Sequence, residues 1–119
     1  MKLSYKEFKV YQDTKILIAK IFRATRQFGN GYYFLADQIN RAVLSIALNI
    51  AEGSAKTSNK DFNRYIQNAL GSATELSAAI EIAYDLKLIG EADYRELEIV
   101  NQSVLKQLGG FSKFLKKNL

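Results

Sequence analysis

The residues best suited to polar chemistry lie near the middle of the chain. They recur at spacings of three, four, four and three residues: Gln38, Arg41, Ser45, Asn49 and Glu52. On a helix these spacings predict a polar ridge along one side. Because a solvated face is more often rich in Lys and Glu, the mixture indicates hydrogen bonding to another helix or a partner. Arg41 and Glu52 lie about three turns apart, so each is expected to find its partner on another helix or subunit.

The composition gives little support to enzymatic chemistry. The chain has no His and no Cys, which removes the commonest general base, thiol nucleophiles and zinc–thiolate sites. Dimetal sites in helical bundles also use Glu-x-x-His pairs, and no Gly-rich phosphate loop is present. Gly109-Gly110 is interpreted as a close-packing point within a helix. We therefore expect a protein without catalytic activity, cofactor or metal.

Basic charge is concentrated in the first 26 residues. This segment contains seven bases and two acids, and it accounts for the whole net charge of +5. Five of its bases share the helical face opposite the apolar residues: Lys2, Lys6, Lys9, Lys20 and Arg23. In an up-down bundle three lysines at the end of the last helix would join them at one pole: Lys113, Lys116 and Lys117. Such a ridge and pole suit a phosphate backbone; the alternative is a solvated face that only confers solubility.

Helical periodicity runs through nearly the whole chain of 119 residues, which contains no Pro. Apolar residues recur with helical spacing over four segments: residues 3–28, 35–50, 62–84 and 94–115. Gly or polar clusters separate these segments. The sequence predicts an all-α, antiparallel, up-down-up-down four-helix bundle that forms one domain over residues 1–119.

Local signals mark where the predicted helices begin and end. Ser58 and Asp61 resemble a capping box at the start of the third helix. Gly90 is a candidate C-cap for that helix. The acidic residues Glu91 and Asp93 suit the first turn of the fourth helix, because negative charge is favourable at a helix N-terminus.

Some apolar residues lie away from the main apolar faces of the predicted helices. The second and third helices each contribute two: Leu44, Leu48, Ile82 and Leu86. Single exposed aliphatic residues are normal, but together these four favour a partner surface, and a second copy of the same chain is the commonest partner. No segment approaches the roughly 20 apolar residues of a membrane span, and the N-terminus lacks the apolar run of a signal peptide. We therefore expect a cytoplasmic protein. An acidic membrane surface is a weaker alternative as the partner of the basic ridge, because the apolar face of the first helix is needed for the core rather than for lipid, and we expect no membrane partner.

A more specific pattern lies in residues 38–76, which read QINRAVLSIALNIAEGSAKTSNKDFNRYIQNALGSATEL. This segment resembles the signature of the bacterial four helix bundle protein family, encoded in intervening sequences of large-subunit rRNA genes. That family is related to the accessory variability determinant (Avd) proteins of diversity-generating retroelements. The matching residues are Gln38, Arg41, Ser45, NIAEG at 49–53, Asp61-Phe62, ALGS at 69–72 and EL at 75–76.

The resemblance implies an antiparallel four-helix bundle that assembles into a homopentameric ring. In the Avd branch it also implies a basic surface that binds nucleic acid and docks a reverse transcriptase. The chain departs from the family pattern at Ala47, where Pro is common, and at Asn40, where a second base often precedes Arg41. The loss of that base moves the expected nucleic-acid contacts from the second helix to the first.

Our leading hypothesis is a non-catalytic homo-oligomer, a pentamer by resemblance, that binds structured RNA or DNA through phosphates. The charge would come from five bases: Lys6, Lys9, Lys20, Arg23 and Arg41. The polar ridge of the second helix would hold helices or subunits in register. The alternative is a protein-interaction scaffold or adaptor ring, in which the bases only confer solubility.

Overall fold

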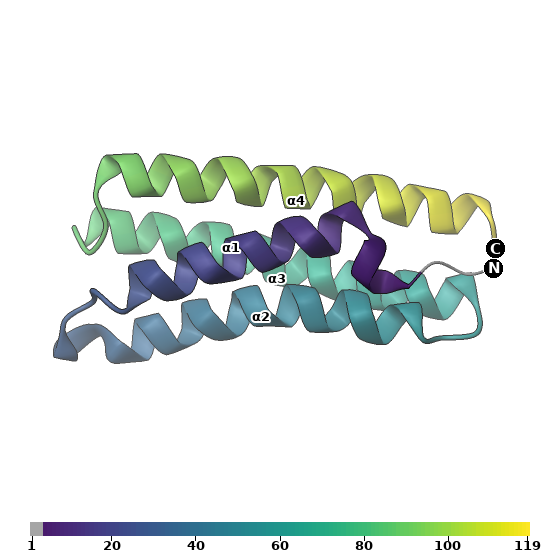
Figure 1. The fold of residues 1–119 in the computed structure, drawn as a ribbon, viewed down its shortest axis with the longest axis horizontal. Helices are drawn as coiled ribbons and strands as arrows, with labels where there is room; N and C mark the ends of the chain where they lie inside the picture. Colours follow the sequence, from purple (N-terminus) through teal and green to yellow (C-terminus); the bar gives the residue numbers. More distant parts are fainter. Residues whose placement is uncertain (1–3) are drawn as a thin grey trace.

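Four helices pack side by side in the computed structural model, which describes residues 4–119 (Figure 1). They are α1 (Lys9–Thr25), α2 (Tyr33–Ser54), α3 (Asn59–Asp85) and α4 (Glu91–Lys117), with short 3-10 turns η1 (Tyr5–Glu7) and η2 (Asn30–Tyr32). Each helix contacts the next, and α4 returns to contact α1. The predicted all-α up-down bundle is confirmed. It measures 46 × 21 × 20 Å, and η1 and the end of α4 lie at the same end of it (Figure 1).

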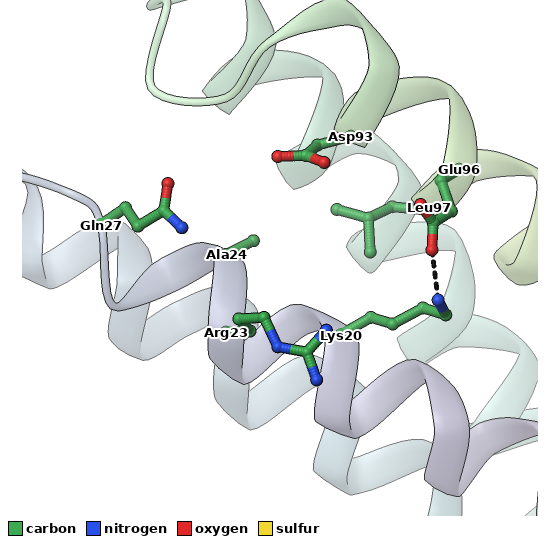
Figure 2. A pocket seen from close by; sticks show the side chains of 7 residues that line it. All are labelled: Lys20, Arg23, Ala24, Gln27, Asp93, Glu96 and Leu97. Atoms are coloured by element: carbon green, nitrogen blue, oxygen red, sulfur yellow. Dashed lines mark hydrogen bonds and ion pairs between the residues drawn. The ribbon is translucent and has the colours of Figure 1, made fainter.

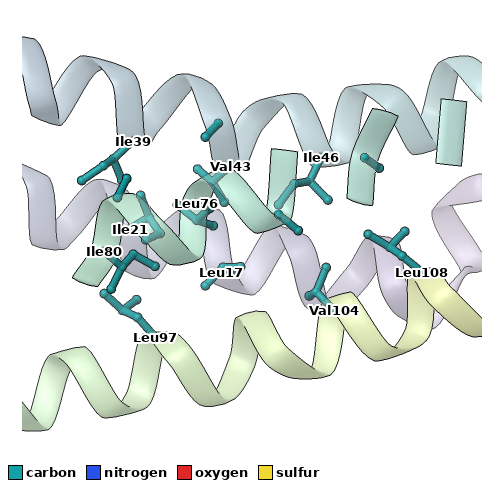
Figure 3. Close-up of a cluster of buried hydrophobic side chains, with 14 of the residues drawn as sticks. Leu17, Ile21, Ile39, Val43, Ile46, Leu76, Ile80, Leu97, Val104 and Leu108 are labelled. Atoms are coloured by element: carbon teal, nitrogen blue, oxygen red, sulfur yellow. The ribbon is translucent and has the colours of Figure 1, made fainter. Parts of the chain in front are cut away.

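The core is a column of aliphatic side chains to which all four helices contribute (Figure 3). Leu17, Val43, Leu76 and Val104 come from α1, α2, α3 and α4 in turn, and none has accessible surface. Burying one such side chain stabilises a fold by about 1.5–3 kcal/mol. The helical spacing of these residues therefore determines which face of each helix turns inward. No helix of the described residues is both long enough and apolar enough to cross a membrane.

The first helix is shorter than predicted at both ends. Leu3 lies outside the described residues, and Phe8 has an extended backbone (φ −68°, ψ 129°), so α1 begins only at Lys9. The aromatic ring of Phe8 packs against those of α3 and α4, and this packing outweighs continuation of the helix. The helix ends at Thr25, and Phe28 packs against the core from the connection that follows.

The cap predicted at the start of α3 is confirmed, because the Ser58 hydroxyl accepts a hydrogen bond of 3.1 Å from the backbone N–H of Asp61. The C-cap predicted at Gly90 is wrong. The chain turns at Lys87, which has a left-handed φ of 64°. The N–H of the next residue, Leu88, donates to the carbonyl of Ala83 at 2.9 Å, as in a Schellman motif.

Close packing of the backbone occurs at a different glycine from the predicted one. A Cβ added at Gly109 or Gly110 would meet no atom within 4 Å, so the predicted packing point there is wrong. At Gly53 an added Cβ would lie 2.7 Å from the Cβ of Tyr65 and 2.9 Å from Cδ1 of Phe62. The last turn of α2 therefore approaches α3 so closely that only glycine fits without a shift.

Candidate nucleic-acid interface

Part of the polar ridge of α2 faces α3. The Gln38 amide donates to the Glu75 carboxylate at 2.9 Å, and the hydroxyls of Ser45 and Ser72 lie 2.9 Å apart. The Asn49 amide donates to the carbonyl and the hydroxyl oxygens of Ser45, at 2.9 and 3.1 Å. These bonds engage the amide and hydroxyl members of the ridge within one protomer, so they are less available to a ligand.

The two charged members of the ridge lie on the outer side of α2. Arg41 donates through Nε to Asp37 at 2.9 Å, one turn earlier on the same helix. The expectation that Arg41 pairs with another helix or subunit is therefore wrong, because it forms an ion pair with Asp37 of its own helix. Glu52 is exposed near the end of α2.

Two bases of the predicted basic ridge of α1 form ion pairs with acids. The Lys9 ammonium lies 2.7 Å from the Asp13 carboxylate. Hydrogen bonds from Lys9 and then from Gln107 of α4, which lies 2.8 Å away, hold the pKa of Asp13 below its ordinary value. Lys20 forms an ion pair with Glu96 of α4. Carboxylates within the bundle thus offset part of the positive charge of Lys9 and Lys20.

A small hollow between α1 and α4 contains two of the predicted bases (Figure 2). It has a volume of about 80 Å³, and its charged lining consists of Lys20, Arg23, Asp93 and Glu96. The hydrogen bond and charge of Lys20, with a smaller effect of Arg23, lower the pKa of Glu96. Two bases and two acids give a balanced site that suits a phosphate group poorly.

The ridge is also interrupted at its start. Lys6 lies on η1, which the extended residue Phe8 separates from α1, and Lys2 lies outside the described residues. Lys6 consequently does not continue the face of α1 that carries Lys9, Lys20 and Arg23. The turn η1, which carries Lys6, packs against α1 and α2 toward the end of the bundle where α4 finishes (Figure 1).

Unpaired basic charge gathers at that end of the molecule. Residues 99–119 contain four lysines and no acid, and three of these lysines are exposed in the last turns of α4. The Asn59 amide donates to the carbonyl of Asn118 at 2.6 Å, which brings the start of α3 beside the end of α4. We define the basic pole by five residues: Lys6, Lys60, Lys113, Lys116 and Lys117. Within residues 4–119 none of the five takes part in an ion pair.

Three acids share this end of the bundle, namely Glu7, Glu52 and Asp61. Asp61 lies 3.6 Å from Arg64, one turn later on α3, so part of its charge is already offset. The five lysines of the basic pole outnumber these acids, and the potential there is therefore positive.

An aromatic cluster fixes the elements that carry the basic pole. Phe8, Phe62 and Phe111 come from the start of α1, from α3 and from α4, and their ring centroids are 5.1–6.4 Å apart. Aromatic pairs at such distances contribute beyond the area they bury. The cluster joins the start of α1 to α3 and α4, and so fixes the backbone near the lysines of α3 and α4.

The opposite end of the bundle is acidic. Residues 81–98 contain six acids and two bases. We define the acidic pole by these acids: Glu81, Asp85, Glu91, Asp93, Glu96 and Glu98. The rings of Tyr84 and Tyr94 stack there at 4.5 Å. Burial, and then the nearby carboxylates of Glu98, Glu81 and Asp85, raise the pKa of Tyr94.

Comparison with known proteins places the chain in a family. Residues 6–110 match the sequence profile of the 23S rRNA-intervening sequence proteins. The chain belongs to the 23S rRNA-intervening sequence protein family. The resemblance inferred from residues 38–76 is thereby confirmed, and the match extends well beyond that segment.

A solved structure shares the fold of this intervening-sequence protein. It is the crystal structure of a protein of unknown function from the S23 ribosomal protein family of Bacteroides thetaiotaomicron. The two superpose with a TM-score of 0.81 over 87% of this chain and 98% of that chain, at 23% sequence identity. No curated protein matches the chain. Neither the family description nor that structure names a catalytic activity.

The predicted oligomer residues of this intervening-sequence protein do not form one patch within a protomer. Leu44, Leu48, Ile82 and Leu86 are 41–57% exposed. The bond between Gln38 and Glu75 places these two residues at the same height on antiparallel helices. Leu44 and Ile82 lie six and seven residues from that bond in opposite directions, which separates them by about 20 Å along the bundle. A subunit interface that uses all four must therefore be long, or must contact two neighbours.

Sequence analysis missed the most exposed aromatic residue of α4. Phe114 is 61% exposed, whereas Phe111 one turn earlier packs into the aromatic cluster. The spacing contained the signal, because Phe114 falls off the helical face that joins Leu108, Phe111 and Leu115.

Proposed function

We propose that this intervening-sequence protein is a non-catalytic, oligomeric nucleic-acid-binding protein that contacts the phosphates of structured RNA or DNA through its basic pole. The observation that carries the proposal is the gathering of five lysines, none in an ion pair within the described residues, at one end of the bundle. Lysines that neutralise phosphates release condensed counterions, which drives binding. Such contacts give affinity without sequence specificity.

The other predicted bases take a secondary part in this proposal. Lys9, Lys20 and Arg41 already contact carboxylates, and Arg23 lies close enough to Glu96 to affect its pKa. A phosphate that approaches them must compete with these acids. Their expected contribution is therefore smaller than that of the lysines of the basic pole, which include the predicted residue Lys6.

Oligomerisation belongs to the same proposal. The resemblance to the rRNA-intervening-sequence and Avd proteins implies a homopentamer, and the exposed apolar residues on α2 and α3 support a subunit contact. A ring would present several basic poles to one nucleic acid and so strengthen weak single contacts. A reverse-transcriptase-like protein partner is expected only by way of the Avd resemblance.

The test is a salt titration of binding to a structured RNA and to a duplex DNA. The wild-type protein is compared with a basic-pole variant (Lys113, Lys116 and Lys117→Gln) and with a control variant of equal charge. The control removes three bases that lie in ion pairs: Lys20→Gln, Arg41→Gln and Arg95→Gln. Wild-type affinity should fall steeply between about 50 and 200 mM salt.

The two variants should behave differently in that titration. The basic-pole variant should bind more weakly, and its dependence of log affinity on log salt should fall by about 0.9 for each lost contact with duplex DNA. The control should lose clearly less affinity than the basic-pole variant, because its bases already contact carboxylates. Equal losses in both variants would place the phosphate contacts elsewhere. If the wild-type protein binds neither nucleic acid at low salt, the proposed function is wrong.

A protein-interaction scaffold is the second candidate, and the 57% exposure of Leu48 favours it. In that case the exposed apolar residues bind a protein, and the lysines serve only solubility. Leu44→Ser with Leu48→Ser should then abolish partner binding, and the wild-type protein should purify without nucleic acid. Absorbance at 260 and 280 nm detects bound nucleic acid readily, because the chain has seven Tyr and no Trp.

A further inference from the structure

Phe114 combines an accessible aromatic ring with unpaired positive charge. The residue is 61% exposed on the penultimate turn of α4. It borders two shallow surface hollows, one lined by Lys113, Lys116 and Lys117 and the other by Gln107 and Phe111. A flat ligand can thus approach the ring beside three ammonium groups.

The residue one turn before Phe114 is Gly110. Gly110 has no side chain, and an added Cβ would meet no atom within 4 Å. Packing within the chain therefore gives no reason for glycine, which is unfavourable inside a helix.

Other exposed aromatic residues lack this setting. Tyr33 and Phe34 are 75% and 68% exposed at the start of α2, at the end of the bundle that carries the acidic pole. The nearest charged residues along α2 are Asp37 and Arg41, which pair with each other. Both ends of the bundle therefore carry exposed aromatic rings. Phe114 differs because three lysines without an ion pair, Lys113, Lys116 and Lys117, line the hollow beside it.

We propose that Phe114 is a stacking platform for an unpaired nucleobase, while Lys113, Lys116 and Lys117 hold the flanking phosphates. Stacking on aromatic side chains tolerates any base, and basic grooves follow the backbone of single strands. A base paired within a duplex keeps its faces covered by its neighbours and cannot stack on the ring. The protein then prefers single-stranded segments, such as loops, to duplex. This inference rests on the proposed function and specifies its ligand.

Fluorescence anisotropy with three labelled probes tests the inference. The probes are a single-stranded oligonucleotide of about 16 nucleotides, an abasic strand of the same length, and the corresponding duplex. The variants are Phe114→Ala, Phe114→Leu and Phe114→Tyr, with Phe34→Ala as the control for loss of an exposed ring. Helical circular dichroism and the mass in solution are measured for each variant.

Phe114→Ala should weaken binding of the single strand roughly 5- to 150-fold. Its binding of the abasic strand and of the duplex should be unchanged, because the lysines remain. Phe114→Leu should behave like the alanine variant, since it keeps an apolar side chain but no aromatic face. Phe114→Tyr and Phe34→Ala should bind like wild type.

Several outcomes would overturn the inference, and they are distinguishable from failure of the proposed function. If Phe114→Ala binds the single strand like wild type while the basic-pole variant loses all binding, stacking is wrong and phosphate binding stands. If Phe114→Ala lowers the mass in solution and weakens all three probes equally, Phe114 is a subunit contact. If the wild-type protein binds none of the probes, both the inference and the proposed function fail.

Discussion

One end of the bundle carries the five lysines of the basic pole and the aromatic cluster of Phe8, Phe62 and Phe111. The other end carries the six acids of the acidic pole and the stacked rings of Tyr84 and Tyr94. Helix α4 spans both ends, with its acids in residues 91–98 and its lysines in residues 99–119. This order also complements the helix dipole, which favours acids at the N-terminus and bases at the C-terminus. Stability alone therefore explains part of the difference between the two poles.

The dipole does not explain the whole basic pole. Lys60 lies in the first turn of α3, where the dipole disfavours positive charge, and Lys6 lies on η1 outside the long helices. The lysines at the end of α4 also have no acidic partner within residues 4–119. The two poles differ in pairing, because Glu96 and Glu91 of the acidic pole form ion pairs with Lys20 and Arg95, whereas no lysine of the basic pole forms one within residues 4–119.

The largest predicted effect concerns the aromatic cluster that supports the basic pole. Phe62→Ala should destabilise the protein by about 3–5 kcal/mol, because it leaves a cavity between α1, α3 and α4. Phe34→Ala, at an exposed ring near the acidic pole, should change stability by less than about 0.5 kcal/mol. Urea unfolding measures both. Similar losses would show that Phe34 is packed against a partner that the single chain does not contain.

A smaller effect is expected at the close approach of α2 and α3 near the basic pole. Gly53→Ala should destabilise the protein by about 1–3 kcal/mol, because the new methyl group meets the Cβ of Tyr65. Gly71→Ala is the matched control within a helix, since no atom lies within 4 Å of its added Cβ. It should stabilise the protein by about 0.5–1 kcal/mol. Thermal unfolding should show a lower melting temperature for Gly53→Ala and a higher one for Gly71→Ala. A Gly53→Ala protein as stable as wild type would contradict the packing argument.

The smallest predicted effect is at the turn between α3 and α4, beside the acidic pole. Lys87→Gly should stabilise the protein by about 0.5–1 kcal/mol, because glycine adopts a positive φ without the strain of a side chain. Lys106→Gly, at an exposed position inside α4, should destabilise by about 0.8–1 kcal/mol. Chemical denaturation compares the two. Lys87→Gly should bind nucleic acid like wild type. Weaker binding would place a ligand contact beside the acidic pole and contradict the proposed site.

The fold was predictable because it depends on patterns that lie within single helices. The spacing of Leu35, Ile39 and Val43 gives the buried face of α2, and Ser58 marks the start of α3 without knowledge of its neighbours. Features that depend on contact between distant segments were not predictable. The extended residue Phe8 breaks the first helix because its ring meets Phe62 and Phe111, more than 50 and 100 residues later in the chain.

The site was only partly predictable for the same reason. A helical wheel places Lys9, Lys20 and Arg23 on one face, but it cannot show that Glu96 lies across from Lys20. It also cannot show that Asn118 meets Asn59, which brings Lys60 to the end of α4. The position of Lys113, Lys116 and Lys117 at one pole was predictable, because both chain ends of an up-down bundle lie at the same end. The sequence thus indicated where bases cluster, while the packing determined which of them stay unpaired.

The most direct test of the difference between the poles is lysine footprinting. The protein is acetylated with and without a structured RNA, and mass spectrometry measures the modification of each lysine. We predict that RNA protects Lys113, Lys116 and Lys117, and that the modification of Lys20 and Lys87 does not change. Protection of Lys87 equal to that of Lys113, or protection of no lysine by an RNA that binds, would contradict a phosphate-binding basic pole.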